Sequence, residues 1–111
     1  MPRFVIVYLG GNQPSTPEEG KRHFASYMEW LAALGESAVS PANPLKDTCT
    51  VNPDGTVTKG GVSTMSGYTI IETDSMESAL SVASSCPFLE IDGSLEVSEL
   101  VEMPGSNQEA D

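Results

Sequence analysis

The stretch GYTIIETDSMESALSVASSCPFLEIDGSLEV, residues 67–97, carries the clearest pattern of secondary structure in the chain. Its first seven residues combine an aromatic residue with β-branched ones, which is typical of a strand. Asp74 follows as a helix cap, and Glu77 three residues later completes an Asp version of the capping box. The helix that starts here has a predicted inner face of Met76, Ala79, Leu80 and Ala83.

Two signals in the second half of this stretch predict where secondary structure is interrupted. Pro87 cannot continue the helix, because it lacks the backbone N–H that an inner turn needs. The pair Asp92-Gly93 then marks a turn. Residues 94–103 follow as a last strand, in which Leu95 and Val97 alternate with polar neighbours. The order predicted for residues 67–103 is strand, helix, strand.

The amino-terminal part of the chain predicts another strand followed by another helix. The run RFVIVYL, residues 3–9, has apolar side chains on both faces and predicts a central strand buried on both sides. Ser15 or Thr16 is expected to cap a helix that begins at Pro17 and stops at Gly35. The apolar residues of this helix share one broad face: Phe24, Tyr27, Met28, Trp30, Leu31 and Leu34.

The middle of the chain contains a strong hairpin signal. Residues 36–48 hold two prolines and predict a loop with room for one short extended piece. The sequence Asn-Pro-Asp-Gly at residues 52–55 separates two Thr/Val-rich runs, so we expect a hairpin of residues 48–51 with 56–59. Residues 60–67 are expected to be polar and flexible.

The full order is strand, helix, hairpin, strand, helix, strand. This order predicts an α+β fold with a ferredoxin-like β-α-β repeat and an extra hairpin, in which two helices cover one face of an antiparallel sheet. The other face carries apolar side chains of its own, and a second copy of the chain is the simplest cover for it. We therefore expect one domain over residues 1–104, a homodimer through the open sheet face, and a disordered acidic tail at 105–111.

Composition excludes several classes of partner. The chain has 111 residues, 39% of them hydrophobic, which is enough for one packed core. Its net charge is −11, and all five basic residues lie within the first 59 positions. Such a surface repels phosphate groups, so the sequence predicts binding neither to nucleic acid nor to a membrane.

Targeting and metal motifs are not found in the sequence. The apolar run near the amino terminus is too short for a signal peptide, and no stretch is long enough to span a membrane. The two cysteines, Cys49 and Cys86, are too few for a disulfide framework and form no CxxC motif. We expect a cytoplasmic protein with free thiols, no metal site and no cofactor.

With this pattern assembled, the chain resembles the YCII-related family of the dimeric α/β-barrel superfamily. The resemblance rests on RFVIVYLGG (3–11), on YMEWLAALGE (27–36) and above all on residues 67–103. It implies the fold just described and a dimer. Some members carry a His on the first helix and an Asp after the second helix as an acid/base pair. Here His23 lies near the His position, and Cys86 stands where the Asp is expected.

Six residues are candidates for a site between the helices and the sheet. His23 is the only histidine and lies on the shoulder of the first helix, where it could act as a general acid or base. Tyr8, Tyr27, Trp30 and Tyr68 provide aromatic walls with polar tips, although each is also a suitable core residue. Cys86 is expected to fill space rather than to react, because a helix carboxyl terminus disfavours a thiolate.

Two functions remain open at this point. The first is a non-enzymatic protein that binds a small organic molecule in this pocket. The second is an enzyme of the lyase or isomerase type that uses His23, as the resemblance to a dehydrochlorinase branch of the family implies. The feature that separates them is a carboxylate close to His23, and the sequence leaves open whether the protein is an enzyme.

Overall fold

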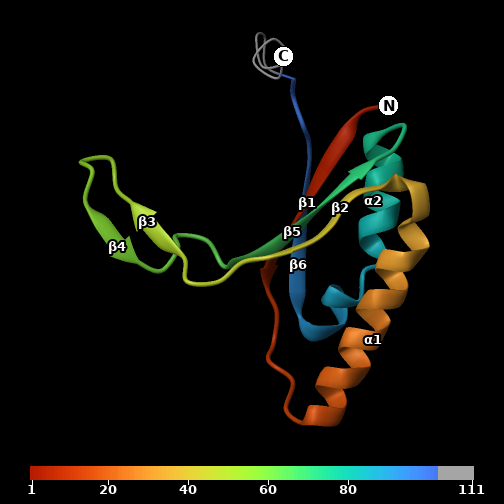
Figure 1. The fold of residues 1–111 in the computed structure, drawn as a ribbon, viewed down its shortest axis with the longest axis horizontal. Helices are drawn as coiled ribbons and strands as arrows, with labels where there is room; N and C mark the ends of the chain where they lie inside the picture. The colour runs from red at the N-terminus through yellow and green to blue at the C-terminus, as the bar shows by residue number, and fades with distance from the viewer. Residues whose placement is uncertain (103–111) are drawn as a thin grey trace.

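The computed structural model describes residues 1–102 and shows one antiparallel sheet with both helices on the same face (Figure 1). The sheet has the strand order β2-β5-β1-β6. Its strands are β1 (Arg3–Gly10), β2 (Ala38–Pro44), β5 (Met65–Glu72) and β6 (Gly93–Glu99), and its helices are α1 (Pro17–Leu34) and α2 (Met76–Ser84). The predicted ferredoxin-like α+β fold is confirmed. The predicted tail at 105–111 lies outside the described residues.

Strand β1 lies in the middle of the sheet, where it pairs with β5 on one side and β6 on the other. Its alternate residues Phe4, Ile6 and Tyr8 face the helices and are buried. The intervening residues, such as Val5 and Val7, face the other side and are only partly buried. The prediction of a strand buried on both sides therefore holds for one face within the single chain.

Helix α1 is capped as the sequence predicts. The Thr16 side chain accepts a hydrogen bond from the Glu19 backbone N–H at 3.1 Å. The carboxylate of Glu19 accepts hydrogen bonds from the hydroxyl and the backbone N–H of Ser15, and these bonds lower the pKa of Glu19. At the other end, Gly35 has a φ of 54°, a conformation that favours glycine.

Trp30 joins the two helices. Its side chain is buried, and its indole N–H donates to the Val82 carbonyl oxygen at 3.1 Å and lies 3.2 Å from the Ser85 hydroxyl. Both acceptors belong to α2 or its carboxyl end. The indole therefore holds α1 and α2 at a fixed separation above the sheet.

Strand β2 corrects the prediction of a loop over residues 36–48. It pairs with β5 along the edge of the sheet, with two interruptions of the register. Pro41 and Pro44 are tolerated because an edge strand uses only one of its two sides for ladder hydrogen bonds. Strand β5 begins at Met65, within the segment that was expected to be flexible.

The second half-repeat differs from the prediction in three details. Ser75, rather than Asp74, caps α2 by accepting from the Ser78 backbone N–H at 3.1 Å. Leu80 is half exposed instead of facing inward, because α2 turns Ala79 and Ala83 toward the core and Leu80 lies about 100° around the helix from Ala79. Strand β6 ends at Glu99, so Val101 is largely exposed and takes no part in the core.

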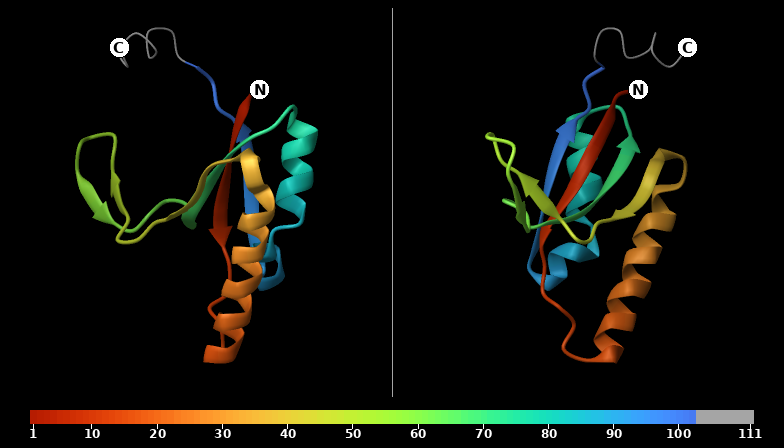
Figure 2. Two further views of the ribbon diagram at one scale, coloured as in Figure 1. Left: turned by 45° about the vertical axis from the view of Figure 1, so that its right-hand side comes forward. Right: turned by 60° about the vertical axis from the view of Figure 1, so that its left-hand side comes forward.

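The predicted hairpin is confirmed and stands apart from the main sheet. Strands β3 (Cys49–Val51) and β4 (Val57–Lys59) form a separate two-stranded sheet. Figures 1 and 2 show it projecting from the main sheet on the side away from the two helices. None of the helices in residues 1–102 combines the length and apolar character needed to cross a membrane.

Candidate functional site

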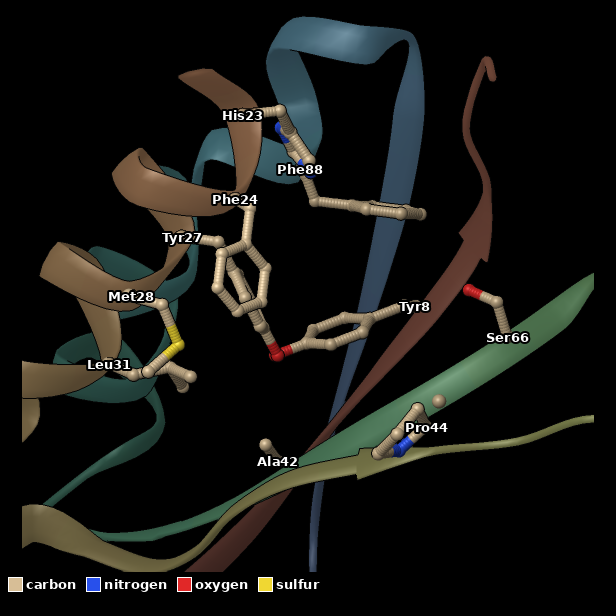
Figure 3. Close-up of a pocket in the computed structure, with 11 residues that line it drawn as sticks. Tyr8, His23, Phe24, Tyr27, Met28, Leu31, Ala42, Pro44, Ser66 and Phe88 are labelled. Atoms are coloured by element: carbon tan, nitrogen blue, oxygen red, sulfur yellow. The ribbon is translucent and has the colours of Figure 1, made fainter. Parts of the chain in front are cut away.

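A cavity of about 460 Å³ opens between α1, the sheet and the short 3-10 helix η2 (Pro87–Ile91). We call it the α1 pocket, because α1 contributes the largest share of its lining. Figure 3 shows side chains of α1 on one side and Tyr8, Pro44 and Ser66 on the other. The lining residues are Tyr8, His23, Phe24, Tyr27, Met28, Leu31, Ala42, Pro44, Ser66, Gly67 and Phe88.

Two large apolar side chains stand at the mouth of the α1 pocket. Phe24 is 62% exposed and Met28 is 47% exposed, and the four-residue spacing places them on the same side of α1. The sequence assigned both to the core-facing side of the helix. The sheet therefore does not cover this part of the apolar face of α1, which lines the pocket on its solvent-exposed side.

Phe88 forms the wall beside η2 and is held firmly in place. Its ring stacks on Tyr8 with the ring centres 5.3 Å apart. On other sides it lies against Gly11 and Gly93, where a Cβ atom would collide with the ring. Nothing in the sequence-based prediction identified Phe88, because the structure of the turn after Pro87 was not predictable from periodicity.

A series of hydroxyl groups connects the pocket wall to the buried face of the sheet. The Tyr27 hydroxyl donates to the Tyr8 hydroxyl at 2.9 Å, and Tyr8 is hydrogen-bonded to the Thr69 hydroxyl. Thr69 in turn donates to the Pro41 carbonyl oxygen at 2.6 Å. Burial raises the pKa of Tyr8 far above its ordinary value, so this phenol stays protonated at physiological pH.

His23 lines the α1 pocket beside Tyr27. The two rings are nearly parallel, with an interplanar angle of 15° and centres 6.5 Å apart. On its outer side, His23 borders a second depression that is also lined by Glu19 and Glu90. Within residues 1–102 no carboxylate is close enough to form an ion pair with the imidazole.

The other predicted site residues lie elsewhere. Cys86 is buried in the core beneath the helices, and burial raises the pKa of its thiol, which disfavours the reactive thiolate. Trp30 fills the space between α1 and α2. Tyr68 pairs with Val7 and points to the open face, since strand alternation places Gly67 and Thr69 on the helix side. None of these three lines the α1 pocket.

The polar groups of the described residues do not form a metal centre. No group of three or more His, Cys, Asp or Glu side chains within residues 1–102 is arranged to hold an ion. The chemistry available in the α1 pocket is therefore that of aromatic surfaces, hydroxyl groups and one imidazole.

Fold and site together define an α+β domain with a ferredoxin-like sheet, two helices on one face and an aromatic pocket. A solved structure with this fold is that of 5-chloro-2-hydroxyhydroquinone dehydrochlorinase from Burkholderia phenoliruptrix AC1100, in complex with 2,5-dihydroxybenzoquinone. It shares 16% sequence identity with this chain at a TM-score of 0.57, over 91% of this chain and 95% of that one. No protein-family model matches the sequence, and comparison with curated proteins gives no match.

Proposed function

We propose that the protein binds a small, uncharged aromatic molecule in the α1 pocket. The observation that carries this proposal is the pair of apolar side chains, Phe24 and Met28, left in water at the mouth of a cavity with aromatic walls. Exposed apolar groups around a concave site are typical of ligand binding. The acidic character of the chain, with a net charge of −11, disfavours anionic ligands.

The solved structure of similar fold supports a ring-shaped ligand. That protein was observed with 2,5-dihydroxybenzoquinone, a single six-membered ring that carries hydroxyl groups. A cavity of about 460 Å³ is within the usual size range of small-molecule sites. Tyr8, Tyr27 and Phe88 can offer ring faces to such a molecule.

Titration with 1,4-dihydroxybenzene (hydroquinone) tests this proposal. In anaerobic buffer, amide NMR signals of α1 and η2 should shift as the ligand is added. The double variant Phe24→Ala/Met28→Ala should weaken binding about tenfold, because it removes apolar contact area at the mouth. It should fold normally, since both side chains are about half exposed or more and neither belongs to the buried core.

The matched control is Leu80→Ala, which removes a half-exposed side chain from α2, outside the pocket. Its affinity for hydroquinone should equal that of the wild type. Equal weakening in the control and the double variant, or shifts spread over α2 and the hairpin, would place the ligand outside the α1 pocket.

Catalysis by His23 is the alternative, and the position of its ring in the same pocket favours it. Against it, the family's acidic residue is replaced by the buried Cys86, and no carboxylate pairs with His23 within residues 1–102. Chloride release from 5-chloro-2-hydroxyhydroquinone distinguishes the two functions. We expect release no faster than without protein; release that is lost in His23→Gln would favour the enzyme.

Membership of the YCII-related family and a homodimer complete the proposal. The order of elements and the three segments at 3–11, 27–36 and 67–103 support the family. The open sheet face supports the dimer, because it presents the partly buried side chains of Val5, Val7 and Ile70 to solvent in the single chain. The free thiols of both cysteines fit a reducing, cytoplasmic compartment.

A further inference from the structure

Hydrogen bonds link the hydroxyl groups of Tyr27, Tyr8 and Thr69 behind the α1 pocket. Each of these bonds can be donated in only one direction. A backbone carbonyl oxygen can accept but never donate a hydrogen bond, so the Thr69 hydroxyl must be the donor in its hydrogen bond to the Pro41 carbonyl oxygen. The Thr69 oxygen is then free only to accept, and Tyr8 must donate to it. Tyr8 has then used its own proton, so Tyr27 donates to Tyr8. The Pro41 carbonyl thereby fixes the orientation of all three hydroxyl groups.

The burial of this series makes its direction stable. Thr69 is completely buried and Tyr8 is 6% exposed, so water is not available to replace either hydrogen bond. Breaking one of them would leave a buried polar group without a partner. Burial also keeps Tyr8 protonated, as its raised pKa indicates. Tyr27 lines the pocket, and the proton of its hydroxyl is already engaged in the hydrogen bond to Tyr8.

We propose that this series makes the α1 pocket selective for ligands that donate a hydrogen bond, such as phenols, with Tyr27 as the specificity-determining residue. The Tyr27 oxygen has lone pairs but no free proton, so it accepts from a ligand hydroxyl. An ether or carbonyl oxygen at the same place would meet those lone pairs, or Tyr27 would have to give up its bond to Tyr8. The inference rests on the proposed function and specifies its ligand class.

Phenol and anisole form a matched pair of probes for this selectivity. Both are neutral single rings of similar shape, but only phenol has a hydroxyl proton to donate. NMR titration of the wild type should give an affinity for phenol about tenfold higher than for anisole, as one hydrogen bond is gained or lost. Tyr27→Phe should weaken phenol binding to the level of anisole and leave anisole unchanged.

Thr69 offers a second test, because it does not line the pocket and cannot touch the ligand. Thr69→Val removes the hydroxyl that fixes the direction while keeping the shape of the side chain. Tyr8 can then donate to Tyr27, and Tyr27 can donate to the ligand, so the preference for phenol should fall to less than about twofold. Thr69→Ser retains the hydroxyl and should retain the preference.

The results separate this inference from the proposed function. If phenol and anisole both shift signals of α1 and η2 with equal affinity in the wild type, the pocket binds aromatic rings but the hydroxyl series does not select them. If Thr69→Val keeps the full preference, the direction of the series is not its cause. If neither compound shifts those signals, the proposed function and this inference both fail.

Discussion

At the scale of single residues, the two cysteines give the clearest contrast in the molecule. Cys86 is 2% exposed in the core, whereas Cys49 lies exposed on the hairpin. Burial raises the pKa of the Cys86 thiol, and a neutral, inaccessible thiol is a poor nucleophile. The cysteine at the break after α2 therefore fills space beneath the helices.

Alkylation of the native protein should modify Cys49 and leave Cys86 untouched. Mass spectrometry of peptides after iodoacetamide treatment near pH 7.5 measures both sites in one sample. Denaturation before the reaction should expose Cys86 and label both. Cys86→Ser should reduce the free energy of unfolding by about 1–2 kcal/mol, because a hydroxyl replaces a thiol in an apolar site. Rapid labelling of native Cys86 would show that it is a reactive site residue.

The raised pKa of Cys86 also predicts a pH dependence of stability. Above about pH 8.5 the thiol ionises in the unfolded chain but stays protonated in the folded one. The unfolded state then binds fewer protons, so the free energy of unfolding falls as pH rises. The contribution of Cys86 is complete below this pH and is lost as the pH rises to the folded-state pKa.

Urea unfolding of variants between about pH 7.5 and 9.5 measures this dependence. Cys86→Ala should flatten the decline, whereas Cys49→Ala, the exposed control, should leave it unchanged. Above about pH 10, Tyr8 adds a decline of the same sign, because burial raises its pKa as well. A decline that is the same in Cys86→Ala and the wild type would rule out this cause.

At the scale of elements, the strands and helices follow closely from periodicity, and the exceptions have physical causes. For residues 36–48 the sequence predicts a loop with one short extended piece rather than a seven-residue strand, because the prolines weaken the strand pattern and only the place of β2 at the sheet edge makes them acceptable. The outward position of Leu80 follows from the rotation of α2 about its axis, which turns Ala79 and Ala83 toward the core and which the spacing of apolar residues does not specify.

The site was predictable only in part, for similar reasons. Tyr8, Tyr27 and His23 were expected between the helices and the sheet, and they line the α1 pocket. Phe88 was missed because a 3-10 turn has no recognisable periodicity. Tyr68 lies on the other face of the sheet, because side chains alternate along β5 and Tyr68 pairs with Val7 of β1. The sequence alone does not reveal this pairing of the two strands.

The close packing of the Phe88 ring against Gly93 leads to a testable prediction. A Cβ atom at Gly93 would collide with the Phe88 ring and approach its carbonyl oxygen. Gly93→Ala should therefore reduce the free energy of unfolding by about 1–3 kcal/mol through overpacking. It should also weaken hydroquinone binding, because the ring has to leave its place against Tyr8.

Gly20→Ala is the control for this substitution. Gly20 lies within α1, where a Cβ atom would meet only Pro14 at 3.3 Å. Alanine in a helix should be neutral there or increase stability by about 0.5–1 kcal/mol. Thermal unfolding of the two variants compares them directly. A Gly93→Ala variant as stable as the wild type would show that η2 moves without cost and that Phe88 is not held in place.

In the molecule as a whole, the face of the sheet that the helices leave open is a surface with many apolar side chains. It presents Val5, Val7, Leu9, Tyr68 and Ile70 without a covering layer in the single chain. The hairpin β3–β4 projects on this same side (Figure 2). A second copy packed on the face would therefore also lie beside the hairpin, where Val51 and Val57 are exposed.

Sedimentation equilibrium at micromolar concentration tests the proposed dimer. We expect about twice the chain mass of 11.7 kDa. Val7→Glu should shift the protein toward a folded monomer, because it places a second carboxylate beside Glu96, the partner of Val7 on β6, at the centre of the open face. Leu80→Lys, on the exposed side of α2, should remain dimeric. A wild type that sediments at the mass of a single chain would contradict the dimer.

A crystal structure with hydroquinone bound would test whether the α1 pocket is an aromatic binding site. We predict the ring between Phe24, Met28 and Phe88, with one hydroxyl within about 3 Å of the Tyr27 oxygen. The hydrogen bonds from Tyr27 through Tyr8 and Thr69 to the Pro41 carbonyl should be intact. Hydroquinone bound only outside the α1 pocket, or a pocket closed by its own side chains at saturating ligand, would show that the α1 pocket does not bind aromatic molecules.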